Sequence, residues 1–250
     1  MLDMTGKVAI VTGGGGDIGR TTAVTLVKQG AKVLLVDLNE DALAASADAV
    51  RNAGGTVETF AADVSDPAQA EAYAQKAVDA FGKIDLFFNN AGIEGPAAPI
   101  VDYPVDAFDK VWSVNVRGVF LGLKAVLPKM TQGGAVVNTA SVAGLIGSPG
   151  LVGYIASKHA VIGITRTAAL EVAGQGIRVN AVCPAPIEGR MMTSIESNAG
   201  APKEAFESTL PLGRYGTPQE VANLVLMLLS DEASYMTGSY YTVDGGSEAS

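Results

Sequence analysis

Short apolar segments alternate with longer helix-forming stretches along almost the whole of this chain. The segments predicted as strands are Val8–Thr12, Lys32–Asp37, Val57–Ala61, Ile84–Asn89, Ala135–Thr139, Arg178–Val182 and Tyr240–Val243. The stretches predicted as helices are Arg20–Gln29, Glu40–Ala53, Pro67–Phe81, Pro104–Met130, Tyr154–Ala173 and Pro218–Leu229. Strands that are apolar throughout, instead of at every second residue, are typical of a parallel sheet buried on both faces. The order of the segments therefore predicts an α/β fold, a doubly wound parallel sheet with helices on both faces.

The chain is expected to form a single domain over residues 1–250, because no linker or low-complexity segment divides the alternation. The stretch Ile187–Gly213 departs from the pattern: it has no strand-like segment and mixes Gly, Pro, Met and charged residues. Long insertions in a compact domain are usually lids or binding loops. Residues 187–213 are therefore expected to form a substrate lid.

Charge and hydropathy exclude several classes of partner. The formal net charge is −9, whereas a nucleic-acid or anionic-membrane partner would require a basic face. The longest apolar run, Leu224–Leu229, is far shorter than the ~20 residues of a membrane span, and the first residues show no signal-peptide pattern. The single cysteine, Cys183, follows an apolar run and is expected to be a buried thiol in a reducing compartment. These features predict a cytoplasmic protein.

A glycine-rich turn, Gly13–Gly19, joins the first predicted strand to a helix that is expected to open at Arg20. Glycines let main-chain N–H groups approach a pyrophosphate, and the helix N-terminus stabilises its negative charge. Taken alone, such a turn could be purely structural. Its position directly after the first strand favours a dinucleotide site in a Rossmann-like domain.

Asp37 ends the second predicted strand, 18 residues beyond Gly19. A carboxylate there can accept hydrogen bonds from an adenosine ribose, and it repels a 2′-phosphate by about 1–4 kcal/mol. No Lys or Arg lies between Val33 and Val50 to offset that repulsion. NAD is therefore the expected cofactor. The structural alternative is a solvated acid at a strand end.

Tyr154 and Lys158 lie four residues apart in a predicted helix, and therefore on one of its faces. A nearby cation can lower the pKa of a phenol from about 10 by about 1–3 units, so that the phenol can exchange a proton with an alcohol or a ketone. By themselves the two residues could be a surface pair. Ser141 closes the fifth predicted strand, at the edge where a ligand is expected. Asn115, inside an apolar helical stretch, is either functional or a hydrogen-bonded core residue.

The series of motifs resembles that of the classical short-chain dehydrogenases/reductases, in order and spacing, over essentially the whole chain. The matching motifs are the Gly13–Gly19 turn, Asp63-Val64, Asn89-Asn90-Ala91-Gly92, Asn115, Ser141, Tyr154 with Lys158, and Val243-Asp244-Gly245-Gly246. The resemblance implies that Tyr154 is the general acid/base and that Ser141 orients the substrate oxygen. It implies that Lys158 binds the nicotinamide ribose and lowers the tyrosine's pKa, and that Asn115 holds a water that relays the proton to solvent.

The resemblance also implies contacts to the cofactor. Asp63 and Val64 would hold the adenine, Asn90 and its neighbours would line the cofactor floor, and Ile187 would meet the nicotinamide amide. The expected cofactor-binding residues are Gly13, Asp17, Ile18, Gly19, Asp37, Leu38, Asp63, Val64, Asn90, Ala91, Gly92, Tyr154, Lys158, Pro184 and Ile187. A homotetramer is implied as well. The apolar circumference of the stretch Pro218–Leu229 agrees with partial cover by another subunit.

Three residues depart from the family pattern. Asp17 replaces a glycine of the turn, Ala185 replaces the glycine that commonly follows Pro184, and Gly189 replaces a threonine that usually contacts the nicotinamide amide. Asp17 is expected to cap the helix N-terminus, with Arg20 partly neutralising it, and so to compete with the pyrophosphate for the positive end of that helix. In the alternative, Asp17 bonds across the turn and holds the glycines in their binding shape.

The expected activity is the NAD-dependent interconversion of a secondary alcohol and a ketone, both small molecules. One alternative is a 3-oxoacyl-thioester reductase, which the charge of −9 disfavours because an acyl carrier is also acidic. The other is a dinucleotide-binding protein without turnover, which would have no need of the Asn115, Ser141, Tyr154 and Lys158 set.

Other chemistry is poorly supplied. The only histidine, His159, points about 100° away from the Tyr154/Lys158 face, and no Cys/His cluster exists, so neither a Ser–His–Asp hydrolase nor a metal site is expected. Five apolar residues are expected either to line a pocket for bulky ketones or to pack in the core: Leu145, Ile146, Met191, Met192 and Ile195.

Overall fold

Seven parallel strands form one sheet in the order β3-β2-β1-β4-β5-β6-β7. The strands are β1 (Val8–Thr12), β2 (Lys32–Asp37), β3 (Thr56–Ala61), β4 (Ile84–Asn89), β5 (Met130–Thr139), β6 (Arg178–Pro184) and β7 (Tyr240–Val243). This computed structural model describes residues 2–249 of the chain. The strand order reverses between β1 and β4, and in open sheets of this kind ligands bind at the carboxyl ends of the strands beside that point.

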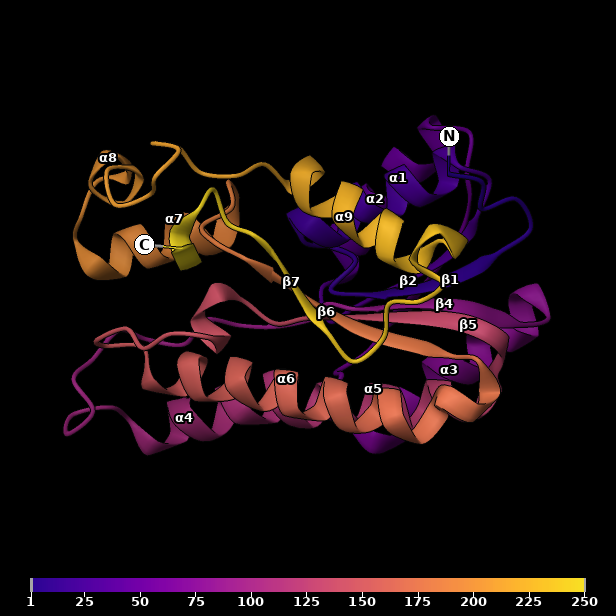
Figure 1. Cartoon of the computed structure of the whole chain (residues 1–250), viewed down its shortest axis with the longest axis horizontal. Helices are drawn as coiled ribbons and strands as arrows, with labels where there is room; N and C mark the ends of the chain where they lie inside the picture. The colour runs from indigo at the N-terminus through magenta and orange to yellow at the C-terminus, as the bar shows by residue number, and fades with distance from the viewer. Residues whose placement is uncertain (1, 250) are drawn as a thin grey trace.

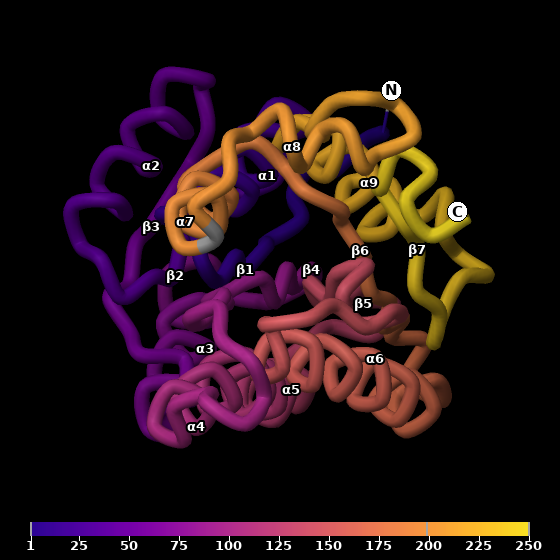
Figure 2. Tube along the Cα trace, turned by 90° about the vertical axis from the view of Figure 1, so that its left-hand side faces the viewer, coloured from indigo at the N-terminus to yellow at the C-terminus, as the bar shows by residue number. Residues whose placement is uncertain are grey.

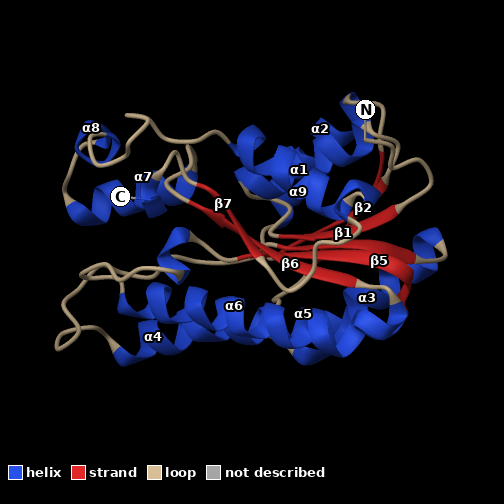
Figure 3. Ribbon diagram, viewed as in Figure 1, coloured by secondary structure: helices blue, strands red, loops and turns tan. Residues whose placement is uncertain are grey.

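The helices cover both faces of the sheet. They are α1 (Asp17–Lys28), α2 (Glu40–Asn52), α3 (Pro67–Phe81), α4 (Val105–Trp112), α5 (Gly118–Val126), α6 (Val152–Val172), α7 (Arg190–Ala199), α8 (Lys203–Glu207) and α9 (Pro218–Leu229). Helices α1, α2 and α9 lie on one face, and α3, α4, α5 and α6 lie on the other (Figures 1 and 3). Successive strand residues point into opposite layers. On β4, for example, Phe87 belongs to the core under α3–α6 and Phe88 to the core under α1 and α9.

The predicted Rossmann-like α/β fold is confirmed, with differences at the ends of elements. Helix α1 begins at Asp17, three residues before the expected Arg20. Strand β5 begins at Met130 instead of Ala135, and its register against β4 shifts between Ile84 and Leu86. The predicted helix Pro104–Met130 is divided, because the segment Ser113–Arg117 is a π-helix between α4 and α5. Cys183 is a free and buried thiol, as expected.

The expected lid, residues 187–213, contains the short helices α7 and α8. Met192 and Leu210 of this segment, with Tyr215 just beyond it, form a small core that is separate from the two main cores and is called the lid core below. Figure 2 views the molecule from the end at which α7 and α8 lie, and both helices stand in front of the sheet. Among residues 2–249, no helix is both long and apolar enough to cross a membrane.

Candidate active site

The glycine-rich turn is a close-packed cradle at the carboxyl end of β1. Gly13 has φ +64°, and a Cβ there would lie 2.9 Å from Asn90 Nδ2 and 3.0 Å from Ala91 Cα. A Cβ on Gly19 would overlap the main-chain oxygen of Gly13. Helix α1 starts with no side-chain cap, so its first N–H groups have no side-chain acceptor. A helix N-terminus of this kind fits the pyrophosphate of a dinucleotide.

Asp37 is tied directly to this turn. Its Oδ2 accepts a hydrogen bond of 3.0 Å from Gly15 N, and its Oδ1 accepts one of 3.1 Å from Asn39 N. The next residue, Leu38, which is expected among the cofactor-binding residues, is 69% exposed. The sequence predicted the position of Asp37 at the strand end but not its bond to the turn.

Thr12 joins the first and fourth strands beneath the turn, and sequence reasoning gave it no role. Its Oγ1 accepts hydrogen bonds from Asn90 N (2.9 Å) and Ala91 N (3.1 Å). In return, Asn90 Nδ2 donates to Thr12 O at 3.1 Å. Asn90 Oδ1 accepts from Thr139 Oγ1 at 3.0 Å. Thr12, Asn90 and Thr139 therefore bind three strand ends together.

Asp63 and Val64 follow β3 at the outer end of the same edge. The hydroxyl of Ser65 donates to Asp63 Oδ1 at 2.6 Å, and this bond holds the pKa of the carboxyl below its usual value. Asp63 N donates to Gln69 Oε1 at 2.7 Å. Val64 is buried, and a Cβ on Gly118 of α5 would lie 2.9 Å from its Cγ2. Both residues are fixed at the rim where the resemblance places the adenine.

Asn115 is fully buried at the centre of the π-helix between α4 and α5. Its Oδ1 accepts from Ile93 N at 2.8 Å, and its Nδ2 donates to Ile93 O at 2.9 Å and to Ser157 Oγ at 3.0 Å. A Cβ on Gly92 would lie 3.3 Å from Asn115 Oδ1 and 3.5 Å from Lys158 Nζ. Gly92 therefore lies between these two side chains. π-Helical turns are frequent at functional sites because they turn a side chain out of the regular helical register.

Ser141, Tyr154 and Lys158 meet where β5 ends and α6 begins. The hydroxyl of Ser141 donates to Pro184 O at 3.2 Å and lies in hydrogen-bonding contact with the phenol of Tyr154. Lys158 Nζ donates to Thr139 O at 2.8 Å and lies 5.4 Å from the centroid of the Tyr154 ring. The three polar groups predicted from different parts of the sequence are thus brought together in one site, the Tyr154 pocket, in which Ser141 and Lys158 are buried and Tyr154 is half-buried.

Burial dominates the electrostatics of this pocket. It raises the pKa of Tyr154 to about 12, while the bond to Ser141 pulls in the opposite direction and the Glu94 carboxylate adds to the rise. Burial also lowers the pKa of Lys158 to about 8. The expectation that Lys158 lowers the tyrosine's pKa is not met in this structure. Its ammonium bonds to Thr139 O, so its effect on the phenol is smaller than the cost of removing the phenolate from water.

Glu94 is a further site residue that sequence reasoning missed. It follows the Asn90–Gly92 segment, is only 9% exposed, and forms an ion pair of 3.7 Å with Arg190 at the start of α7. A charged side chain is rarely buried to this degree without a partner. The only signal in the sequence was the position of Glu94, two residues after Gly92, and this position matches no motif that would assign it a role.

The segment after β6 leads from the site into the lid. Pro184 ends β6 and accepts the bond from Ser141, and Ala185 N donates to Val243 O at 3.1 Å. Ile187 is buried and pairs with Gly216 in an isolated bridge. Gly189 is the N-cap residue of α7. Ile18, in the first turn of α1, packs at the edge of the core that contains Ile187.

The prediction that Asp17 caps α1 is wrong. The N-cap residue is Gly16, and Asp17 is the first helical residue, whose side chain makes no capping hydrogen bond to α1. Its Oδ1 accepts from Arg20 at 2.8 Å, as expected, but its Oδ2 accepts from Arg190 N of α7 at 3.1 Å. The carboxylate therefore reaches the lid instead of bonding across its own turn.

Two of the five apolar residues assigned to a substrate pocket pack elsewhere. Met192 is buried in the lid core, and Ile195 packs against that core. Leu145 packs at the edge of the core under α6. Ile146 is 43% exposed and is therefore more open to solvent than its neighbour Leu145. Core packing thus accounts for Met192 and Ile195. Fewer apolar side chains are therefore available to line a substrate pocket than the sequence predicted.

His159 is exposed on α6, with Nδ1 2.9 Å from Ile155 O. No cluster of three or more His, Cys, Asp or Glu side chains suited to a metal ion occurs in the described part of the chain.

This chain is similar over almost its whole length to known oxidoreductases. A family model described as enoyl-(acyl carrier protein) reductase matches residues 15–248. Levodione reductase from Leifsonia aquatica is 46% identical over 98% of this chain and 95% of its own length. Cyclohexanol dehydrogenase from an Acinetobacter species is 40% identical over 96% and 94%. The 3-oxoacyl-[acyl-carrier-protein] reductase of Thermotoga maritima is 39% identical over 98% and 99%.

Solved structures agree with the fold over the full length. The crystal structure of levodione reductase superposes with a TM-score of 0.96 at 45% identity, covering 98% of this chain and 99% of that one. The crystal structure of NAD+-bound xylitol dehydrogenase gives a TM-score of 0.93 at 39% identity, covering 97% and 99%. Both similarities extend over nearly the whole of this chain.

Proposed function

Because this chain belongs to the classical short-chain dehydrogenase/reductase family, we propose that it interconverts a secondary alcohol and a ketone by hydride transfer with NAD(H). The observation that carries the proposal is the convergence of Ser141, Tyr154 and Lys158 in the Tyr154 pocket. That pocket lies at the same sheet edge as the glycine-rich turn. A proton donor and an anion-binding helix end are therefore held on one side of the molecule.

The residues of this edge fit a nicotinamide dinucleotide. The proposed pyrophosphate site is the turn from Gly13 to Gly19 with Ile18, the adenosine site is Asp37, Leu38, Asp63 and Val64, and the floor is Asn90, Ala91 and Gly92. Lys158, Tyr154, Pro184 and Ile187 complete the nicotinamide end. When bound, the dinucleotide supplies the hydride acceptor for oxidation and the hydride donor for reduction.

Tyr154 exchanges the proton in this scheme. Its raised pKa keeps the phenol protonated at neutral pH, so that the hydroxyl donates to the oxygen of a ketone; in oxidation, the phenolate takes the proton of the alcohol. The Ser141 hydroxyl, whose one proton is donated to Pro184 O here, would turn that proton toward the same oxygen. Lys158 Nζ offers two further N–H groups beyond its bond to Thr139 O, and these suit a ribose hydroxyl.

Asn115 is proposed to pass the proton onward. Its amide fixes the main chain of Ile93, and its remaining acceptor capacity on Oδ1 faces the space between Gly92 and Lys158. A water held there would link Lys158 to solvent. Removal of the amide would also leave Ile93 N and O without their partner, so Asn115 has a structural share in the site.

The preference for NAD rests on Asp37. Its carboxylate is held at the edge of the turn by Gly15 N, where the adenosine ribose hydroxyls would lie, and it would repel a 2′-phosphate there. The NAD+-bound state of the xylitol dehydrogenase neighbour supports the same choice.

A small ketone or alcohol is the proposed substrate, under a lid made of residues 187–213. Levodione reductase and cyclohexanol dehydrogenase are among the relatives, and cyclohexanol is a cyclic secondary alcohol. Ile146, which follows Ser141 and is 43% exposed, and the half-buried Met191 of α7 are the apolar side chains proposed to contact the substrate. A homotetramer in the cytoplasm remains our expectation for the working protein.

A 3-oxoacyl-thioester reductase is the rival activity, which the 39% identity to the Thermotoga enzyme favours. The description of the matching family model names an acyl-carrier-protein substrate as well, but for reduction of an enoyl group. The net charge of −9 disfavours docking of an acidic acyl carrier, and Asp37 disfavours NADPH. A dinucleotide-binding protein without turnover is less favoured, because the Ser141, Tyr154, Lys158 and Asn115 set is complete.

A substrate panel separates these possibilities. Formation or loss of NADH absorbance would be followed with cyclic ketones and alcohols, linear ketones, sugars and a 3-oxoacyl thioester, each with NAD(H) and NADP(H). The proposal expects the highest kcat/KM for an alcohol–ketone pair with NAD(H). A higher kcat/KM for the thioester with NADPH would replace it with the rival activity, and no turnover of any compound would favour the binding protein.

A further inference from the structure

Asp17 connects the cofactor turn to the lid. Its Oδ2 accepts a hydrogen bond of 3.1 Å from Arg190 N, a residue 173 positions away in the sequence, while its Oδ1 is held by Arg20 at 2.8 Å. Arg190 is the first residue of α7, and its N–H is one of those that a helix cannot satisfy internally. The carboxylate therefore caps α7 from outside the helix and places a negative charge at its positive end.

Gly189 is the counterpart of this contact. It is the N-cap residue of α7, provides no side-chain cap, and has φ +143°, in the region that favours glycine. A Cβ at position 189 would overlap Asp17 Oδ2 and would lie 3.1 Å from Asp17 Cγ. The carboxylate thus occupies the space that a side chain at 189 would need. Asp17 and Gly189 are a matched pair.

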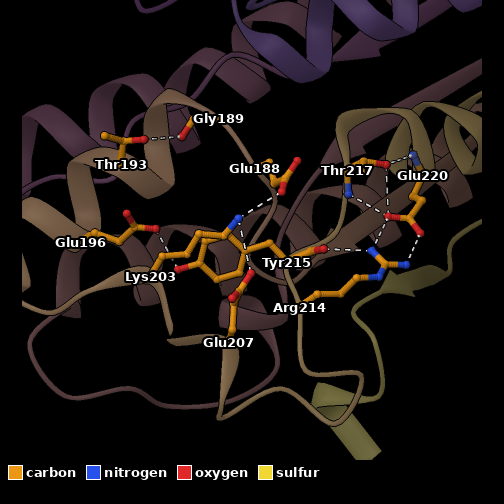
Figure 4. Close-up of polar contacts among 10 residues, drawn as sticks. All are labelled: Glu188, Gly189, Thr193, Glu196, Lys203, Glu207, Arg214, Tyr215, Thr217 and Glu220. Carbon is orange, nitrogen blue, oxygen red and sulfur yellow. Dashed lines mark hydrogen bonds and ion pairs between the residues drawn. The ribbon is translucent and has the colours of Figure 1, made fainter. Parts of the chain in front are cut away.

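The rest of the lid is held together internally, so a contact at its first helix bears on the whole segment. Figure 4 shows these contacts: Tyr215 donates to Glu196 at 2.9 Å, and Lys203 lies 3.1 Å from Glu188 and 3.4 Å from Glu207. Arg214 forms two hydrogen bonds to Glu220, which anchors the far end of the lid to the start of α9.

Arg190 holds the near end of the lid on two sides. Its main-chain N–H meets Asp17 on the cofactor turn, and its guanidinium lies 3.7 Å from Glu94, whose charge acts on Tyr154. We propose that Asp17 is a positioning residue, which fixes the start of α7 between the cofactor turn and the Tyr154 pocket and so sets the lid over the substrate. The lid's role in substrate binding rests on the proposed function, but the contact itself does not.

Amide hydrogen exchange of the cofactor-free protein tests the contact without any assay of activity. Asp17→Gly should raise exchange over residues 190–199 at least tenfold, because the first N–H of α7 loses its acceptor. Asp17→Asn keeps an acceptor oxygen and should stay within threefold of wild type. Asp66→Gly is the matched control: it removes a carboxylate that caps α3 through Ala68 N and Gln69 N, and it should leave residues 190–199 unchanged.

A double-mutant cycle tests the matched pair. Gly189→Ala in the wild-type background meets both the backbone strain and the Asp17 carboxylate, whereas in the Asp17→Gly background it meets the strain alone. The rise in substrate KM caused by Gly189→Ala should therefore be at least fivefold smaller in the Asp17→Gly background. Asp17→Gly alone should raise KM at least fivefold while the NADH dissociation constant stays within threefold.

Unchanged exchange at residues 190–199 in Asp17→Gly would overturn the proposal, as would additive effects of the two substitutions. A tenfold rise in the NADH dissociation constant with unaltered lid exchange would make Asp17 an organiser of the cofactor turn instead. Altered exchange together with absence of turnover in the wild type would leave the lid contact established and refute only the proposed function.

Discussion

The ammonium of Lys158 lies 5.4 Å from the centroid of the Tyr154 ring and donates its hydrogen bond to Thr139 O. The two side chains are one helical turn apart on α6, in a pocket where burial moves both pKa values toward the neutral forms. The phenol, with a pKa of about 12, therefore keeps its proton at neutral pH. This is the form that a ketone reduction uses and an alcohol oxidation must first ionise.

This difference predicts opposite pH profiles for the two directions. Below the pKa of Tyr154, about 12, the phenolate fraction rises about tenfold per pH unit, so kcat/KM for alcohol oxidation should rise steeply between pH 6 and 8. Above pH 8 the slope should fall below one, because Lys158, with a pKa of about 8, loses its charge and stabilises the phenolate less. Ketone reduction should stay nearly flat from pH 6 to 8. Initial rates in both directions measure this, and a flat oxidation profile would count against Tyr154 as the base.

Asp37→Ser should reverse the cofactor preference. The substitution removes the proposed ribose acceptor, the repulsion of a 2′-phosphate and the bond to Gly15 N, so the ratio of kcat/KM for NAD to that for NADP should fall about a hundredfold. Asp41→Ser, at an exposed position on α2, is the control and should leave the ratio unchanged. A wild type that already prefers NADP would refute this account of Asp37.

Assembly is expected to involve the face formed by α4, α5 and α6 more than α9. Most of the apolar run Leu224–Leu229 is buried within the chain itself. By contrast, Trp112 is 41% and Phe120 51% exposed, and they share a groove with Val116 and Ile164.

Phe120→Asp should therefore dissociate the expected homotetramer, because a carboxylate would have to be buried in the contact. Light scattering at micromolar concentration measures the mass. Ala45→Asp, an exposed position of α2 on the opposite face of the sheet, should leave the tetramer intact. A monomeric wild type would contradict the expectation.

The substrate is expected to be a bulky or cyclic ketone. Met192 and Ile195 pack in or against the lid core and Leu145 packs against the core under α6, so this preference rests on Ile146 and Met191. Competition between cyclohexanone and an open-chain sugar ketone measures it. A higher kcat/KM for the sugar, in keeping with the xylitol dehydrogenase neighbour, would overturn the prediction.

The sequence was sufficient for the architecture because local signals and global fold agree. The central strands β1, β2, β4, β5 and β6 carry the apolar runs of a buried parallel sheet, whereas the edge strands β3 and β7 are only partly buried. The motif residues fall at the carboxyl ends of the strands. The site residues Ser141, Tyr154 and Lys158 could be found because each stands at a position that the fold itself defines. The π-helix around Asn115 gave no such signal, since it changes the pairing of main-chain groups without interrupting the helical pattern.

Contacts between distant segments were beyond reach of the sequence. The bond from Asp17 to Arg190 and the pair of Glu94 with Arg190 depend on where α7 packs, which no local pattern encodes. The sequence predicted that Asp17 caps its own helix, whereas its Oδ2 accepts from Arg190 N, far away in the sequence. The same holds for the pKa of Tyr154, because the depth of burial outweighs the neighbouring cation and burial depends on the assembled pocket.

Tyr154→Phe tests the central claim most directly, because it removes the phenolic oxygen and its proton and leaves the ring. Steady-state turnover and NADH titration would be compared with Tyr103→Phe, whose buried hydroxyl has no hydrogen-bond partner among the described residues. The account predicts that Tyr154→Phe loses at least about a thousandfold in kcat and binds NADH within threefold of wild type, while Tyr103→Phe keeps its activity. Turnover of Tyr154→Phe within about tenfold of wild type would contradict the assignment of Tyr154 as the acid/base.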